Sequence, residues 1–179
     1  MRLTRIAVVT TAIVLLSAGV VWFTNIRAAS DPTGLADTTP QGPGLERYVD
    51  SLGGFFFDYP AGLKITVTDD GDDSHVIFGD TANGETRLMV VTSPYDLNTP
   101  LTEDMIRDEF ADITPPVDRT SLPSGITAFL FRRAAATIGA TRDALFVHNG
   151  KLYQVSVTPT SDDASNRILE SWRFDSSQL

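Results

Sequence analysis

Cysteine is absent from this 179-residue chain, and histidine occurs only twice, as His75 and His148. The absence of cysteine excludes disulfide bonds, cysteine nucleophiles and metal sites built from thiolates. Two histidines without partners at ligand spacing do not specify a zinc site, so we interpret both as surface residues at strand ends. The folded part of the chain must therefore rely on its hydrophobic core for stability.

Basic residues are also scarce, since lysine and arginine number 14 against 23 aspartates and glutamates. Arg2, Arg5 and Arg27 precede Ser30, and every acidic residue follows it. This leaves 11 basic and 23 acidic residues beyond that point, a net charge of −12. A surface this acidic repels nucleic acid and anionic lipid. We therefore predict no nucleic-acid partner.

Catalytic signatures are missing as well. The chain has no G-x-S-x-G elbow, no Ser-x-x-Lys motif and no glycine-rich phosphate loop. Ser124 lies in a Pro-Ser-Gly sequence outside any elbow, and Glu103 and Asp104 are adjacent on a predicted helix, where they face different ways. The sequence predicts a protein that is not an enzyme, and a hydrolase with a non-standard site is the remotest alternative.

One long hydrophobic run is present, residues 6–23, which contain 18 residues and no charge. This length meets the lower limit for a membrane-spanning helix and exceeds the roughly 7–15 residues of a signal-peptide core. The basic leader, residues 1–5, favours a cytoplasmic N-terminus. We predict a single-pass anchor in the cytoplasmic membrane with the rest of the chain outside. The alternative is a signal peptide cut near Ala28 or Ala29, which would leave a periplasmic or secreted protein.

Residues 24–44 are predicted to form a flexible linker, because Ala28–Gly44 is rich in Pro, Gly, Thr and Asp and has no periodic pattern. Residues 45–179 are predicted to form one extracytoplasmic domain. Its 135 residues are enough to bury a core without staples.

The first half of this domain alternates between short apolar runs and turns. Phe55–Pro60 is predicted to be a strand buried on both sides and stopped by proline, and Thr99–Asp112 a helix that begins at Thr102 and is stopped by Pro115-Pro116. The other predicted elements are a helical turn at Leu45–Leu52, strands at Leu63–Thr68, Val76–Phe78, Arg87–Thr92 and Val117–Ser121, and a C-terminal helix at Ser161–Ser171.

The second half is predicted to be a β-meander. Asn149-Gly150 favours a type I′ turn, because both central residues of that turn need positive φ. A two-residue loop fixes the register and pairs Val147 with Leu152, Phe146 with Tyr153 and Ala144 with Val155. The three strands are Ile126–Arg133, Thr137–Val147 and Leu152–Thr158. Both faces are apolar, which predicts helices over each. The fold class is α+β, an antiparallel sheet of about six to eight strands flanked by helices.

Two groups of charged residues are candidate sites. Asp69, Asp70, Asp72 and Asp73 could present oxygens to Ca²⁺, although their spacing departs from an EF-hand loop, and a solvated hairpin tip is the favoured interpretation. The doublet Arg132-Arg133 could bind an acidic partner or pair with surface aspartates, and we favour the second interpretation.

Two stretches resemble the PsbP/Mog1-like domains. They are FFFDYPAGLKI (Phe55–Ile65) and GKLYQVSVTPTSDDASNRILESWRF (Gly150–Phe174), and the latter ends in a Ser-aromatic-x-Phe segment at Ser171–Phe174. The resemblance covers about Gly53 to Phe174. It implies a strand–proline opening, a mid-chain helix, a meander and a C-terminal helix. Such domains act as extrinsic or envelope-associated binding subunits, with roles from photosystem assembly to GTPase binding, but an anchor at residues 6–23 departs from the lumenal and nuclear members.

The sequence therefore predicts a non-catalytic, membrane-anchored protein of the cell envelope, whose domain binds a protein partner or stabilises an assembly. The alternative is a small-molecule or metal-binding module. A partner-binding domain should expose an apolar or charged patch, whereas a ligand-binding module should have a concave pocket with converging polar groups.

Overall fold

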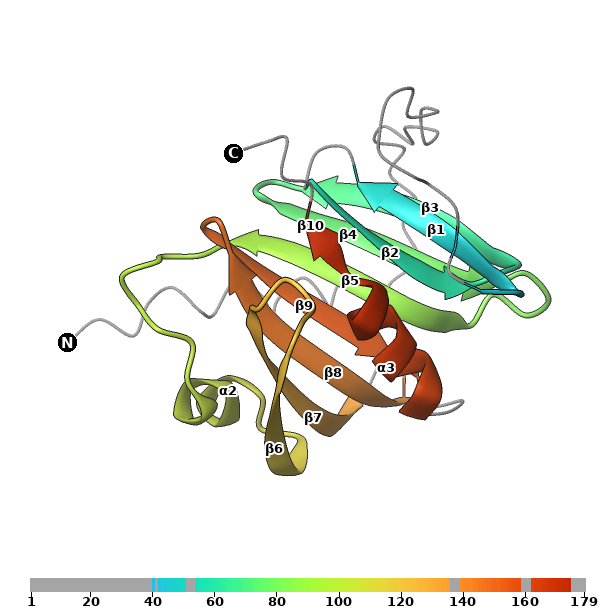
Figure 1. Ribbon diagram of the computed structural model, residues 1–179. Helices are drawn as coiled ribbons and strands as arrows, with labels where there is room; N and C mark the ends of the chain where they lie inside the picture. Colours follow the sequence, from blue (N-terminus) through green and yellow to red (C-terminus); the bar gives the residue numbers. More distant parts are fainter. Residues whose placement is uncertain (1–39, 41, 51–53, 136–138, 159–161, 175–179) are drawn as a thin grey trace.

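The computed structural model describes residues 40, 42–50, 54–135, 139–158 and 162–174 (Figure 1). The predicted leader and membrane-spanning segment, residues 1–23, lie outside this part of the chain. Within it, no helix is both long enough and apolar enough to cross a membrane.

Seven antiparallel strands form the large sheet, in the order β3-β4-β5-β9-β8-β7-β6. Neighbouring strands are mostly joined by hairpins, and β9 inserts beside β5, so the two halves of the chain meet in the middle of the sheet. The strands are β3 (Leu63–Asp70), β4 (Asp73–Asp80), β5 (Thr86–Pro94), β6 (Ile113–Ser121), β7 (Thr127–Ala135), β8 (Gly139–His148) and β9 (Lys151–Val157).

The hairpin between β8 and β9 has the predicted turn and register. Asn149 and Gly150 have φ of 47° and 73°, as a type I′ turn requires. The pairs Val147–Leu152, Phe146–Tyr153 and Ala144–Val155 face one another as predicted. The hairpin thereby puts Phe146 and Tyr153 on one face of the sheet.

A second, three-stranded sheet covers that face together with a helix (Figure 1). It consists of β1 (Leu45–Asp50), β2 (Phe55–Pro60) and β10 (Arg173–Phe174), and the helix is α3 (Asp162–Ser171). The prediction of a helical turn at Leu45–Leu52 is wrong, because β1 pairs with β2 along its whole length and buries Tyr48 against the core. The fold is predominantly β, so the predicted α+β class is correct only in part.

Aromatic rings fill the space between the two sheets. Trp172 has no exposed surface, and its ring stacks on Phe55 and Phe57 with centroids 4.7 and 4.8 Å away. Phe56, between them, points to the opposite face of β2, where the Arg47 guanidinium lies 5.2 Å from its ring. The predicted burial of this strand on both sides is therefore corrected, since Phe56 is only partly covered.

The other face of the large sheet carries the short helix α2 (Glu103–Glu109). Thr102, the predicted start of this helix, is its N-cap and accepts a hydrogen bond from the Met105 N–H. The helix ends at Glu109, well before Pro115-Pro116, so the proline pair does not stop it. The prolines lie within β6, where pairing with β7 is interrupted, and proline cannot donate to a strand ladder.

Candidate functional site

A small cavity lies between α2 and the large sheet, with a volume of about 60 Å³. Its walls are mainly apolar side chains from α2, from the loop before it and from three strands of the large sheet, β5, β8 and β9. Its polar lining comes from Ser93, Tyr95, Glu109 and Gln154, and its apolar lining from Pro94, Leu101, Met105, Ile106, Phe110, Leu145 and Leu152. The cavity is thus assembled from residues within two stretches of the sequence, 93–110 and 145–154.

Two polar atoms of this lining are buried without a hydrogen-bond partner in the described structure, the side-chain oxygen Oε1 of Gln154 and the hydroxyl of Tyr95. Gln154 is 2% exposed. Its Nε2 donates to Asp143 at 3.3 Å and to Ser156 at 3.2 Å, so Oε1 is directed away from both. A buried polar atom without a partner is costly, and both oxygens lie within the cavity wall with almost no accessible surface of their own.

The Gln154 side chain is held by a buried network around Asp143. The Asp143 carboxylate accepts hydrogen bonds from Arg133 Nε at 3.2 Å and Thr141 Oγ1 at 2.6 Å, and also from the Ser156 hydroxyl and Gln154. All five residues are at least nine-tenths buried. Because both carboxylate oxygens are fully engaged, this network fixes the orientation of Gln154 and does not expose a nucleophile.

Arg133 connects the network to α2. Its guanidinium lies 4.7 Å from the ring of Phe110, the residue that closes the helix. The two arginines of the predicted doublet therefore lie in different environments. Arg132 is exposed, whereas Arg133 is buried and pairs with Asp143. The expected pairing with a surface aspartate is corrected, because Asp143 is 1% exposed.

The surface around the cavity is acidic. Residues 96–112 contain six carboxylates and one arginine, a net charge of −5. That arginine, Arg107, bonds to Glu103 one helical turn earlier at 2.7 Å. Asp104, Asp108 and Asp112 are all exposed. Burial, with the negative charge of Asp96 beside it, raises the pKa of Tyr95, so its hydroxyl stays neutral and can still donate.

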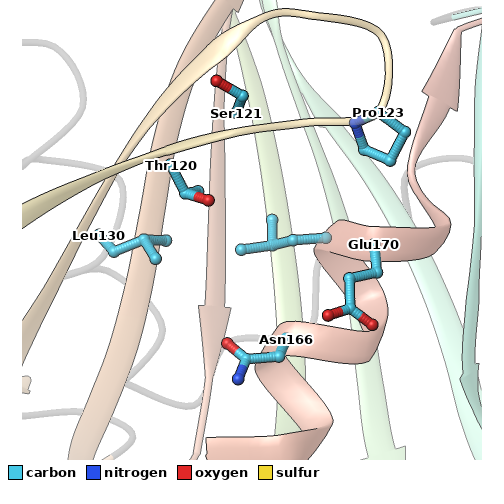
Figure 2. A pocket seen from close by; sticks show the side chains of 7 residues that line it. Thr120, Ser121, Pro123, Leu130, Asn166 and Glu170 are labelled. Carbon is cyan, nitrogen blue, oxygen red and sulfur yellow. The ribbon is translucent and has the colours of Figure 1, made fainter.

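A second cavity, of about 110 Å³, lies between α3 and the hairpin that β6 and β7 form (Figure 2). Thr120, Ser121 and Pro123 line it from one side, and Asn166 and Glu170 from the helix. Its side chains carry no buried polar atom without a partner, in contrast to the lining of the cavity beneath α2. It is the weaker candidate for a binding site.

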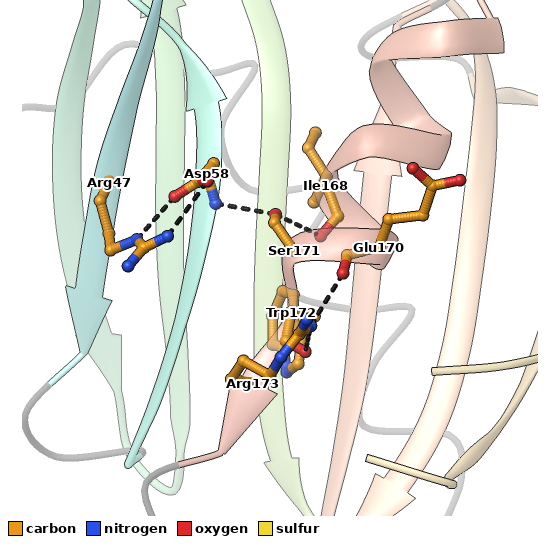
Figure 3. Close-up of polar contacts among 7 residues, drawn as sticks. All are labelled: Arg47, Asp58, Ile168, Glu170, Ser171, Trp172 and Arg173. Carbon is orange, nitrogen blue, oxygen red and sulfur yellow. Dashed lines mark hydrogen bonds and ion pairs between the residues drawn. The ribbon is translucent and has the colours of Figure 1, made fainter. Parts of the chain in front are cut away.

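A further buried polar cluster joins β1, β2 and α3 (Figure 3). The Asp58 carboxylate accepts from Arg47 at 2.6 and 3.2 Å, and the Asp58 N–H donates to the Ser171 hydroxyl oxygen at 2.9 Å. Arg173 donates to the carbonyl oxygens of Glu170 and Trp172, each at 2.8 Å. These contacts tie the end of α3 to the small sheet, and we assign the cluster to folding.

The four aspartates predicted as weak Ca²⁺ candidates lie at the tip of the β3–β4 hairpin. Asp69, Asp70 and Asp72 are exposed, and Asp73 is half-buried. No group of three or more metal-ligating side chains is found among the described residues. None of the four lines either cavity.

Most of the large pKa changes belong to core tyrosines. Burial raises the pKa of Tyr153 to about 12 and also raises the pKa of Tyr48 and Tyr59. These rings pack between the two sheets, so their raised pKa values are a result of core packing and do not mark a functional site. His148 differs, because burial against Phe174, whose ring centroid is 3.9 Å away, lowers its pKa.

His148 should make folding weaker in mild acid. Its pKa is lower in the folded protein than in the unfolded chain, so the stability it contributes is complete above about pH 6.5 and is lost as the pH falls through the lowered value. Urea unfolding at pH 7.5 and pH 5.5 should show a larger loss of stability for the native protein than for the variant His148→Gln. Equal losses would contradict this assignment.

Sequence reasoning missed Tyr95, Gln154 and Asp143. The sequence did contain a signal, because these polar residues lie on strands whose two faces were both predicted to be covered. In the structure Asp143 faces Ser156 across β8 and β9, and Gln154 faces Leu145. Polar residues in register on such strands must find partners, which marks a network.

No protein-family profile matches the sequence, and no curated protein sequence matches it. Among solved structures, the chain is similar to that titled "Solution Structure of Cyanobacterial PsbP (CyanoP) from Synechocystis sp. PCC 6803". The TM-score is 0.52 at 16% sequence identity, and the match covers 82% of this chain and 98% of the other. The PsbP-like fold implied by the sequence resemblance is thereby confirmed. At this identity the likeness concerns the fold alone.

Proposed function

We propose that this protein is a non-catalytic binding subunit of the cell envelope, anchored by residues 6–23, whose domain docks a protein partner through the surface around α2. The observation that carries the proposal is Leu97, which is 67% exposed and is the one large hydrophobic residue exposed to this degree in the described part of the chain. It lies on the loop between Tyr95 and Leu101, both of which line the cavity. A single exposed leucine is ordinary, so the support comes from Leu97 taken together with the apolar walls of the adjoining cavity.

The size of the cavity favours a protein over a free small molecule. Sites for small molecules usually hold roughly 300–1,000 Å³, and an engineered cavity of about 150 Å³ takes up benzene. The cavity beneath α2 holds about 60 Å³. A free ligand of so few atoms gains little binding energy, whereas one side chain of a partner can fill the same space while the rest of the partner covers Leu97.

Site-directed photocrosslinking in cells tests this function. A benzophenone amino acid is placed in the full-length, membrane-bound protein at Asp104 on α2, at Lys64 on β3 or at Asn166 on α3, all of which are exposed. We expect one envelope protein to be captured reproducibly from Asp104 and not from Lys64 or Asn166, and to be identified by mass spectrometry. Capture that is the same from all three positions and limited to abundant bystanders would overturn the proposal.

A further inference from the structure

We infer that the outer edge of β3 is the surface through which two copies of this chain pair, so that their large sheets join into one. The two β3 strands run antiparallel about a two-fold axis at Val67. The inference goes beyond the proposed function and does not depend on it, because β3 contributes no residue to the cavity beneath α2.

The two edges of the large sheet differ in how they are protected against pairing. β3 and β6 are its outer strands (Figure 1). β6 carries Pro115-Pro116, and its ladder with β7 is interrupted there. Prolines and breaks of this kind are devices by which natural proteins blunt an edge strand. β3 has neither, because it contains no proline and all eight of its residues pair with β4 in one unbroken register.

The outer edge of β3 presents backbone groups that can accept another strand. Asp70 and Asp73 flank the two-residue turn Gly71-Asp72, so Asp70 directs its N–H and C=O toward β4. These directions alternate along a strand, and Ile65 and Val67 therefore direct theirs outward. No backbone hydrogen bond reaches these outward groups from any other described residue. They are available for a further antiparallel ladder.

The side chains of β3 also favour pairing. Its three apolar side chains pack against the core and yet are only half-buried at this edge: Leu63, Ile65 and Val67. A second strand beside them would remove more of their surface from water. Thr66 and Thr68 are exposed on the opposite face, and β-branched residues such as these are favoured in strands.

The charges of β3 select a second copy as the occupant. Lys64 lies near one end of the strand and Asp70 at the other, and both are exposed on the same face. An antiparallel copy centred on Val67 sets each Lys64 directly opposite an Asp70. The backbone permits this register, since Val67 then exchanges hydrogen bonds with its own counterpart. Asp70 gains a basic partner, whereas within its own hairpin it faces Asp73, and like charges in that position are unfavourable.

Disulfide crosslinking tests this register, because the native chain has no cysteine and every disulfide must come from an introduced one. Thr66 lies opposite Thr68 of the second copy as a non-hydrogen-bonded pair, with Cα atoms about 4.5 Å apart, which suits a disulfide. Thr66 and its own counterpart are diagonal neighbours about 7–8 Å apart, which is too far. Full-length Thr66→Cys and Thr68→Cys chains with different tags are co-expressed and oxidised in intact cells with copper phenanthroline. We expect the mixed dimer to exceed either self-linked product several-fold.

The other edge of the sheet provides the control for random collisions. Asp118 is exposed on β6, and Asp118→Cys should give little dimer under the same oxidation. Equal amounts of mixed and self-linked products, or no more dimer than Asp118→Cys gives, would overturn the inference.

Exchange of charges tests the contact between Lys64 and Asp70. The dissociation constant of the dimer is measured by sedimentation of the full-length protein in detergent micelles. It should rise about tenfold in Lys64→Glu, because two attractive pairs become repulsive, and return to within about threefold when Asp70→Lys is added. Arg167→Glu, which makes the same change of charge at an exposed position of α3, should leave it unaltered. A double variant that dimerises no better than Lys64→Glu would contradict the pairing.

Photocrosslinking distinguishes a second copy from another protein at this edge. Benzophenone at Lys64 should link two chains of this protein, recognised by their different tags. Capture of a different protein from Lys64 in place of the second copy would overturn the inference. Capture of an envelope protein from Asp104 without any dimer would overturn the inference and leave the proposed function standing, and a dimer without capture from Asp104 would do the reverse.

Discussion

Alanine in place of Trp172 should lower the free energy of unfolding by about 3–5 kcal/mol, the range for removing a large buried aromatic side chain. Trp172 has no exposed surface and lies against the rings of Phe55 and Phe57 from β2 and Phe146 from β8. The indole contacts rings of both the small sheet and the large sheet, so its removal takes contacts from both layers at once. A domain is usually stable by only about 5–15 kcal/mol, and the variant should therefore be close to unfolding.

Urea unfolding followed by circular dichroism measures this effect. The midpoint should fall sharply for Trp172→Ala and much less for Trp172→Phe, which keeps an aromatic ring in place. Leu97→Ala is the control, because Leu97 is 67% exposed and should change stability by no more than about 0.5 kcal/mol. If Trp172→Ala and Leu97→Ala had the same midpoint, the ring cluster would not be the centre of the core.

Replacement of Asp143 by leucine should lower the free energy of unfolding by about 3–5 kcal/mol, because it leaves a buried charge unpaired. The change leaves the Arg133 guanidinium buried without its carboxylate, which is 3.2 Å away in the native protein. It also removes the acceptor used by Thr141, Ser156 and Gln154. Most of the loss should come from the uncompensated charge, since removal of one partner of a buried ion pair costs far more than removal of both.

The double variant Arg133→Met with Asp143→Leu tests whether the uncompensated charge accounts for most of the lost stability. If the buried charge dominates, the double variant should recover most of the stability lost in Asp143→Leu, as measured by the urea midpoint. The matched comparison is Arg107→Met with Glu103→Leu, an ion pair on the exposed side of α2, where each step should change stability by at most about 1 kcal/mol. A double variant as unstable as Asp143→Leu would show that packing of the carboxylate, and not its charge, is decisive.

The sequence signals that succeeded are local ones. Asn149-Gly150 determines its turn from two residues, because few other pairs tolerate positive φ at both positions. Thr102 followed by acidic residues determines the start of α2 through one hydrogen bond and favourable charge at the helix N-terminus. Neither signal needs any knowledge of what lies elsewhere in the chain.

The features that sequence reasoning missed depend on distant segments. The apolar spacing of Leu45–Leu52 suits a helix, yet pairing with β2 makes it a strand, since tertiary contacts override weak local preference. The two residues of β10 are too few to carry a strand pattern. Similarly, the cavity takes Tyr95, Glu109 and Gln154 from three different elements, and no spacing along the chain brings them together.

The small sheet joins the two ends of the folded domain, since β1 and β2 open it and β10 closes it. The hydrogen bond from Asp58 to Ser171 spans 113 residues. The chain therefore has a high contact order, for which slow folding is expected. During synthesis, the part of the aromatic face that α3 and Trp172 cover stays exposed until this last helix has left the ribosome. Such a nascent chain would depend on chaperones to hold it in solution, and a truncation before Trp172 would never complete its fold.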